Sequence, residues 1–290
     1  MQTGKNSLAI GILCYGVWGV LPIYWNLLSG VNSLLILCCR IIFAFVCMFI
    51  VLAITGRLQV FFDTIKDKKK MQFLVPASIL VAFNWGLFIY AVNSGNIMYS
   101  SLGYYMNPLL SFSFGVIIFK EKFTKLQLAA VALALSGVLV SVIAYGRLPI
   151  ISLSLAGTFA VYGVLKKKAG VDPNVGIAIE SLLMTPFALI FAFTFMTDSI
   201  GAASFAELLL LVGGGAATAI PLVLYARAVN GLPYITVGFL QYISPSLSII
   251  WGLITGIRPT ESQLVSFAFI GMGLVVFSYA LVRINKKIGG

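Results

Sequence analysis

The sequence contains no histidine and only 8 acidic residues among 290, and charged residues of both signs make up 9% of the chain. A soluble domain usually carries about 25% charged residues, so these charges are too few to cover a soluble fold of this length. The four cysteines form no C-x-x-C pair, and without histidine they predict neither a zinc site nor a disulfide framework. These absences exclude a soluble enzyme, a nucleic-acid-binding domain and a disordered tail, and no metal or cofactor is expected.

Long apolar runs take up most of the chain, which is 60% hydrophobic. A helix that spans a bilayer needs about 20 apolar residues, and ten runs of this kind are present. Strands of a membrane barrel would alternate polar and apolar residues over about ten positions, and these runs do not. The predicted fold class is therefore an all-α integral membrane protein with ten transmembrane helices, over residues 7–28, 32–55, 72–93, 98–118, 126–145, 149–166, 175–196, 205–228, 232–254 and 263–283.

The basic residues are distributed unevenly between the connections. If the N-terminus is cytoplasmic, 16 of the 19 basic residues lie on the cytoplasmic side, as the positive-inside rule predicts. Arg147 and Arg258 then lie outside, and Arg40 lies within a span. The net charge of +11 therefore reflects topology rather than nucleic-acid binding, and both termini are expected in the cytoplasm. The 16 cytoplasmic residues are Lys5, Arg57, Lys66, Lys68, Lys69, Lys70, Lys120, Lys122, Lys125, Lys166, Lys167, Lys168, Arg227, Arg283, Lys286 and Lys287.

An internal repeat divides the chain into two halves. The string at residues 17–21, VWGVL, matches residues 161–165, VYGVL, and farther on the residues Ala91-Val92-Asn93 match Ala228-Val229-Asn230. The two halves, residues 1–146 and 147–290, would each hold five spans, and because five is odd the second half must be inverted. Inverted repeats are a common plan of secondary transporters, with the substrate site near the midplane between the halves.

Several motifs together resemble one transporter family. They are Gly16-Val17-Trp18-Gly19, Pro22-Ile23-Tyr24-Trp25, Arg40 after a small-residue run, Asn84-Trp85, Ala91-Val92-Asn93, Ser101-Leu102-Gly103-Tyr104-Tyr105-Met106-Asn107-Pro108, Lys120-Glu121-Lys122, Tyr162-Gly163, Glu180 and Leu240-Gln241-Tyr242-Ile243-Ser244-Pro245. In this order they resemble the EamA-type transporters of the drug/metabolite transporter superfamily, in the RarD-like branch. The resemblance implies ten helices, cytoplasmic termini, and export or exchange of small organic molecules such as amino acids.

The chain departs from the RarD-like branch at two places. Cys39 stands where the branch often has a histidine, and Arg258 followed by Glu261 stands where the branch tends to carry a glutamate. No role of either family residue is therefore carried over to this chain.

Aromatic residues with a proline mark one face of the first span. Residues 11, 15, 18, 22 and 25 recur at helical spacing, and Pro22 removes a backbone hydrogen bond that could open the helix near a cavity. We expect Trp18 and its repeat partner Tyr162 to contact substrate and Pro22 to take part in gating. The alternative is a packing stripe, with Trp25 in an interfacial aromatic belt.

The fourth and ninth spans carry polar and aromatic groups in register beside a proline. A proline within a helix leaves the carbonyl of residue i−4, here Tyr104 and Gln241, without its helical partner. Two inverted kinks favour a shared cavity between the halves, whereas the alternative is a kink used only for packing. The expected substrate contacts are Tyr104, Tyr105, Asn107, Gln241 and Tyr242, with Pro108 and Pro245 in gating and the mid-span amide Asn84 as a further contact.

Two charged residues lie deep inside predicted spans, about two helical turns from the nearer boundary: Arg40 in the second and Glu180 in the seventh. Each costs at least ~2.5 kcal/mol to insert, so an intramembrane charge indicates a functional site by default. Arg40 is expected to anchor a substrate carboxylate or a closed gate, and Glu180, the sole carboxylate deep within a span, is the candidate for proton coupling. Because they lie near opposite faces, direct pairing between them is not expected. The alternatives are an Arg40 that snorkels outward or a structural pair, and Glu121 is interpreted as a loop salt bridge.

The function predicted from the sequence is secondary transport of small organic metabolites, as exporter or exchanger, in a bacterial-type plasma membrane. The expected partners are a small-molecule substrate and the lipid bilayer, without nucleic acid, and the protein is expected to be a monomer or weak homodimer. A receptor or scaffold and a membrane-embedded enzyme are the alternatives. The sequence lacks the set of acid and base residues that a membrane-embedded enzyme would need. A channel would need a ring of charged residues or a carbonyl filter. No P-loop is present, so ATP is not expected to be the energy source.

Overall fold

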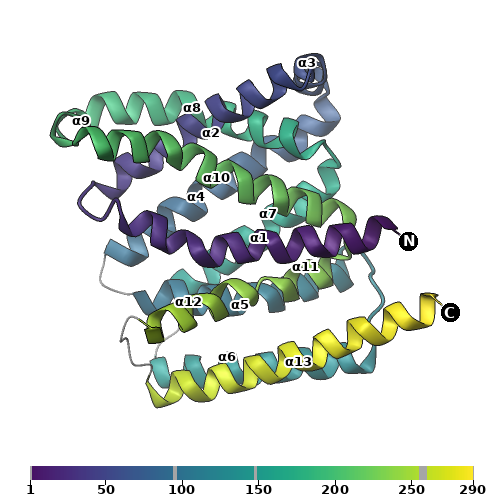
Figure 1. Cartoon of the computed structure of the whole chain (residues 1–290). Helices are drawn as coiled ribbons and strands as arrows, with labels where there is room; N and C mark the ends of the chain where they lie inside the picture. Colours follow the sequence, from purple (N-terminus) through teal and green to yellow (C-terminus); the bar gives the residue numbers. More distant parts are fainter. Residues whose placement is uncertain (1, 94–96, 147–148, 255–259, 290) are drawn as a thin grey trace. The chain divides into compact units, whose positions relative to one another are not determined.

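The structure, a computed structural model of the whole chain, describes residues 2–93, 97–146, 149–254 and 260–289. Arg147 and Arg258, both expected on the outside, lie outside these described residues. The regular structure of the described residues is helical: α1 (Gln2–Asn26), α2 (Ser33–Ile54), α3 (Leu58–Lys66), α4 (Lys68–Asn93), α5 (Ile97–Ile117), α6 (Lys125–Tyr145), α7 (Ile150–Ala169), α8 (Pro173–Phe195), α9 (Thr197–Ala202), α10 (Phe205–Gly231), α11 (Tyr234–Leu240), α12 (Ile243–Ile254) and α13 (Glu261–Gly289) (Figure 1).

Eight helices among the described residues are long and apolar enough to cross a membrane, namely α1, α2, α4, α6, α7, α8, α10 and α13. Large apolar side chains on them are exposed, including Ile143 at 77% and Val275 at 70%. Apolar surface on this scale is unfavourable in water but not against hydrocarbon. The chain is therefore an all-helical membrane protein, as its composition predicts.

The first compact unit combines Met1–Tyr90 with Val161–Gly231. Within it α2 packs against α8 and α10, and α1 packs against α10. The contact between α2 and α10 requires Gly215, because a Cβ at this position would overlap the backbone carbonyl of Phe43. Small residues that allow helix backbones to approach closely are typical of membrane helix packing.

The second compact unit combines Ala91–Ala160 with Leu232–Gly290. In it α13 packs along α6, and α11 packs along α5 (Figure 1). A Cβ at Gly137 of α6 would lie 2.7 Å from the carbonyl oxygen of Ser266 on α13, and the Ser266 hydroxyl donates to the Gly137 carbonyl at 2.7 Å. The Phe239 and Phe277 rings stack with centroids 3.8 Å apart in the core of this unit.

The predicted ninth span, residues 232–254, is not one helix. It forms α11 and α12, separated by a turn at Gln241 and Tyr242. Pro245 has no N–H to donate to the Gln241 carbonyl, and the N–H of Ser244 donates to that carbonyl instead, at 3.2 Å. The Gln241 carbonyl, which loses its helical partner because of Pro245, therefore accepts from a neighbouring N–H group. Pro22 and Pro108, by contrast, lie within the unbroken helices α1 and α5.

Candidate functional site

Glu180 lies about two turns into α8 and is buried against α7. Its Oε1 accepts a hydrogen bond from Nζ of Lys166 at 2.7 Å, and its Oε2 accepts one from the Tyr162 hydroxyl at 3.0 Å. The Lys166 and Glu180 side chains are 5% and 4% exposed. Tyr162 and Lys166 meet the same carboxylate because residues four apart lie on one face of a helix. Lys166, expected in a cytoplasmic connection, is thus half of a buried ion pair.

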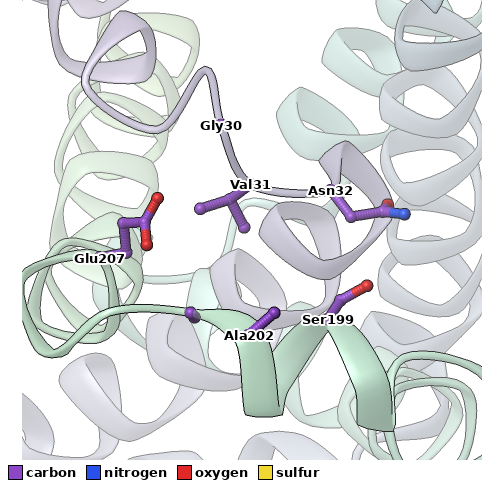
Figure 2. A pocket seen from close by; sticks show the side chains of 7 residues that line it. Gly30, Val31, Asn32, Ser199, Ala202 and Glu207 are labelled. Atoms are coloured by element: carbon purple, nitrogen blue, oxygen red, sulfur yellow. The ribbon is translucent and has the colours of Figure 1, made fainter.

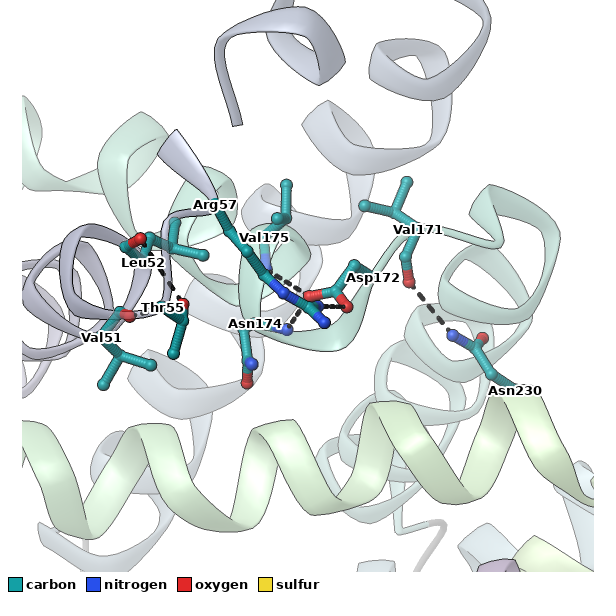
Figure 3. Close-up of polar contacts among 9 residues, drawn as sticks. All are labelled: Val51, Leu52, Thr55, Arg57, Val171, Asp172, Asn174, Val175 and Asn230. Atoms are coloured by element: carbon teal, nitrogen blue, oxygen red, sulfur yellow. Dashed lines mark hydrogen bonds and ion pairs between the residues drawn. The ribbon is translucent and has the colours of Figure 1, made fainter. Parts of the chain in front are cut away.

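The connection between α7 and α8 brings these residues together. Gly170 has a left-handed backbone (φ 56°), which ends α7, and the Asp172 carboxylate caps α8 by accepting from the N–H groups of Asn174 and Val175. Pro173 occupies the first turn of α8, where its missing N–H costs nothing. Asp172 also forms an ion pair with Arg57 (Figure 3). The turn that joins the two helices is therefore short and fixed, and Glu180 faces the last turns of α7.

Asn230, at the end of α10, is tied to the same connection. Its side-chain amide donates to the carbonyl of Val171 at 3.1 Å (Figure 3). Nζ of Lys167 donates to the carbonyl of Val229 at 3.3 Å. In the structure Asn230 joins α10 to the turn between α7 and α8.

Four aromatic residues, here called the aromatic cluster, pack around Tyr225: Tyr15, Trp18, Tyr162 and Tyr225 itself. The Tyr162 and Tyr225 rings stack with centroids 5.9 Å apart and planes 12° apart. Trp18 lies 5.6 Å from Tyr225 and 5.5 Å from Tyr15. The three tyrosines are at most 2% exposed. The expected pair of Trp18 and Tyr162 therefore lies in one cluster, but Tyr225 mediates between the two rings.

Arg40 is held between two indole rings in the same unit. Its guanidinium carbon lies 4.6 Å from the Trp25 ring centroid and 4.7 Å from that of Trp85, and its Nε donates to the Thr218 hydroxyl at 3.0 Å. Cation–π contacts of this kind stabilise a desolvated cation by about 2 kcal/mol. Gly214 lies beside this arrangement, where a Cβ would make ordinary van der Waals contact with Trp25 at 3.5 Å and with the Arg40 stem at 3.8 Å. Four helices, α1, α2, α4 and α10, thus fix this cation within the membrane region.

The two intramembrane charges have separate partners. Both carboxylate oxygens of Glu180 are engaged by Lys166 and Tyr162, while Arg40 lies between tryptophans. This agrees with the expectation that Arg40 and Glu180 do not pair directly. Asn84, the expected mid-span amide, precedes Trp85 on α4 and is half-buried.

In the second unit, Tyr105, Asn107 and Tyr242 are buried, and they take part in two separate sets of hydrogen bonds. The Tyr242 hydroxyl donates to the carbonyl of Tyr105 at 3.1 Å. The Asn107 amide donates to the carbonyl of Ala156 at 2.9 Å, and its oxygen accepts from the Ser111 hydroxyl at 3.2 Å. These bonds connect α5 with α7 and with the turn between α11 and α12.

The remaining expected residues of this region differ in their exposure. Gln241, Pro108 and Pro245 are buried, whereas Tyr104 is 43% exposed and does not share the environment of Tyr105. Pro22, expected in gating, also lies on the exposed side of its helix. Consecutive helical residues point in directions about 100° apart, so Tyr104 and Tyr105 cannot both face the core.

Glu121 caps a helix. Its two carboxylate oxygens accept from the backbone N–H groups of Tyr234 and Ile235 at 2.6 and 2.9 Å. These are the first residues of α11, where N–H groups lack helical acceptors and an anion is stabilised by the helix dipole. Interpreting Glu121 as a loop salt bridge missed this role, because the sequence does not indicate which helix start lies beside it.

A polar cavity of about 390 Å³ lies where the α1–α2 connection approaches α9 and the start of α10 (Figure 2). It is lined by Gly30, Val31, Asn32, Ser199, Ala202, Ala203 and Glu207. Glu207 accepts from the N–H and the hydroxyl of Ser204, and the Ser204 hydroxyl accepts from the N–H of Glu207, which is a capping box. The single acid that lines this cavity therefore stabilises the start of α10.

The residues that sequence reasoning missed are the partners of the two charges. Lys166 follows Tyr162 by four residues, a spacing that places both on one face of a helix and could have indicated a shared partner. Because Lys166 is also the first of three consecutive lysines, it was interpreted as part of a basic cytoplasmic connection. Tyr225 and Thr218 are contributed by α10, and no motif links them to Tyr162 or Arg40.

Comparison with known proteins places the chain among transporters. The sequence profile described as the EamA-like transporter family matches residues 6–143. The chain is 38% identical over 284 residues to the uncharacterized transporter YojE of Bacillus subtilis (strain 168), covering 96% of this chain and 95% of that protein. It is 35% identical over 287 residues to Protein RarD of Escherichia coli (strain K12), covering 98% and 97%. A solved crystal structure with 16% identity shares the fold, with a TM-score of 0.74 over 97% of this chain and 99% of that chain.

Proposed function

The chain belongs to the EamA-like transporter family, with RarD proteins among its homologues, and on that premise we propose that it is a secondary transporter that exports or exchanges small organic metabolites. Alternating access between two states is the proposed mechanism. Because the chain belongs to a transporter family, the alternative function of a membrane-embedded enzyme is excluded. The proposed substrates are amino acids or related amphipathic compounds.

The observation that carries the substrate class is the Arg40 guanidinium between Trp25 and Trp85. The guanidinium carbon lies over both indole rings, and the planar N–H fork of an arginine matches a carboxylate in a bidentate manner. The neighbouring indoles would supply flat apolar surface to the rest of the solute. A compound with a carboxylate and an apolar or aromatic body meets both requirements.

The other expected contacts have different roles in this proposal. Trp18 and Asn84 are half-buried and are proposed as substrate contacts with Arg40. The Tyr242 hydroxyl is bonded to the Tyr105 carbonyl, and the Asn107 amide is bonded to the Ala156 carbonyl and to Ser111. We therefore assign these three to the packing beside the kinks at Pro108 and Pro245, where rearrangement during transport would exchange these bonds.

For topology we propose ten spans in two inverted halves, residues 1–146 and 147–290, with both termini cytoplasmic. α5 and the pair α11 and α12 would supply the two spans beyond the eight helices named above. The compact units divide the first half after Tyr90 and the second half after Ala160 and after Gly231. In support, the divisions after Tyr90 and Gly231 are equivalent within a few residues in the repeat. The proposed functional unit is a monomer in the bilayer, since one chain supplies all the partners of Arg40 and Glu180 described here.

Ligand-induced stabilisation of the purified protein, followed by flux, tests this function. A metabolite panel is screened for compounds that raise the melting temperature, since a ligand of the native state stabilises it. Each hit is then measured in proteoliposomes for saturable uptake that is accelerated by the same solute on the opposite side. A carrier predicts both properties. Binding without flux would instead support a receptor, and flux without saturation would support a channel.

A further inference from the structure

Lys166 and Glu180 form a buried ion pair, which the surrounding helices shield from solvent. Beyond Tyr162, the titratable groups on the elements packed around the pair are Cys14 and Tyr15 of α1 and Tyr225 of α10. The charged residues near the start of α8 are Asp172 and Arg57, which pair with each other. Lys166 is therefore the cation that neutralises Glu180 among the described residues.

The Lys166 ammonium has a short route to water. Lys166 lies in the last turn of α7 together with Lys167 and Lys168, and Lys168 is exposed. A lysine stem of four methylenes can place its charged end along the helix toward the aqueous boundary. Glu180, on its short side chain two turns into α8, cannot follow. Separation of the pair would therefore leave an uncompensated carboxylate in the protein interior, which is strongly unfavourable.

The packing limits what could replace the ammonium. A Cβ at Gly176 would lie 3.0 Å from Nζ of Lys166, which is closer than most Cβ contacts, so the surroundings of the ammonium are tightly packed. Ile177 and Ile179, which lie just before Glu180 on α8, are at most 1% exposed. A metal ion needs several oxygen ligands and an organic amine needs space, whereas a proton needs neither.

We propose that Glu180 is a proton-binding site whose resident counter-cation is Lys166, so that the carboxylate holds either the Lys166 ammonium or a proton. On protonation, a proton from water forms an O–H bond at Oε1, and the Lys166 ammonium, with its own proton retained, moves to the aqueous end of α7. Tyr162 stays hydrogen-bonded to the other oxygen, positioned by its stacking on Tyr225. As a coupling step this rests on the proposed transport function, but the exchange itself requires no substrate.

Infrared titration of the full-length protein in lipid nanodiscs tests the exchange, with the proton as the only probe. The signal is the C=O stretching band of a protonated carboxylic acid, assigned to Glu180 by its loss in Glu180→Gln. In the wild-type protein the band should be absent at neutral pH and should appear on acidification while the fold persists. Lys166→Gln should show the band already at neutral pH, whereas Lys166→Arg, which keeps the cation, should behave like wild type.

The wild-type titration keeps the test decisive even if Lys166→Gln does not fold. A Glu180 band that is present in wild type at neutral pH, or that never appears before acid unfolding, would overturn the exchange. A folded Lys166→Gln protein without the band at neutral pH would also overturn it. Since no solute is added, these results are independent of flux. Failure of the proposed transport function would instead appear as missing saturable uptake.

Discussion

The Tyr162 ring stacks on the Tyr225 ring with centroids 5.9 Å apart, and the Tyr162 hydroxyl donates to Glu180. One side chain therefore links α10 to the buried ion pair between α7 and α8. The ring and the hydroxyl act separately, so they can be tested separately.

Tyr162→Phe should keep the stacking and lose the hydrogen bond to Glu180. Hydrogen bonds to charged groups contribute about 1.5–3 kcal/mol, so we expect the free energy of unfolding to fall by a value in this range. Denaturant unfolding in mixed micelles measures it. Tyr279→Phe, at a residue 59% exposed on α13, is the matched control and should change little. Equal stability of the two variants would mean that the Tyr162 hydroxyl does not stabilise the carboxylate.

Gly215→Ala should disrupt the contact between α2 and α10, because the added Cβ meets the Phe43 backbone rather than a flexible side chain. Overpacking typically costs about 1–3 kcal/mol, and we expect a value at the upper end. Gly16→Ala on α1 is the control, since no atom lies within 4 Å of its Cβ position, and it should be neutral or stabilising by up to about 1 kcal/mol. The reverse order of melting temperatures would contradict this packing.

Glu121→Gln should weaken the start of α11, because a neutral amide offers one acceptor oxygen in place of two charged ones. Loss of a helix cap costs about 0.5–2 kcal/mol. Asp198→Asn in the exposed start of α9 is the control and should change stability by less than about 0.5 kcal/mol. Hydrogen exchange at Tyr234 and Ile235 should also accelerate in Glu121→Gln, and unchanged protection there would exclude the cap.

The proposed topology places Lys68 in the cytoplasm and Ser199 outside. In a variant with the four native cysteines replaced by alanine, a cysteine at Lys68 should not react with a membrane-impermeant maleimide in intact cells. A cysteine at Ser199, which lines the polar cavity, should react. The opposite pattern would invert the topology, and reaction at both sites would exclude the span assignment between them.

Helix positions could be predicted from the sequence because a run of about 20 apolar residues has few alternatives in lipid. The break of the ninth span was only partly predictable: Pro245 indicated a kink, but the same residue type leaves α5 unbroken at Pro108. The difference depends on whether a neighbouring N–H group can donate to the carbonyl that the proline leaves without its helical partner. This is a property of the packed structure.

The candidate site was harder to predict than the fold. The cost of burying charge identified Arg40 and Glu180 from the sequence, but their partners were not recognised. Lys166 resembled the other basic residues at helix ends because a long side chain can face either water or the interior. Trp25, Trp85 and Thr218 meet Arg40 from three helices, and the sequence alone does not specify which faces of these helices meet.

The central claim is that Arg40 binds the carboxylate of the transported solute, and uptake by Arg40→Lys tests it most directly. Lysine keeps the charge but loses the planar fork. For an amino acid that the wild-type protein transports, we expect KM to rise at least tenfold in Arg40→Lys, with the melting temperature nearly unchanged. The corresponding amino acid amide, which lacks the carboxylate, should be transported poorly and about equally by both proteins. Equal KM values for the amino acid in the two proteins, with the amide transported as well as the acid, would contradict the claim.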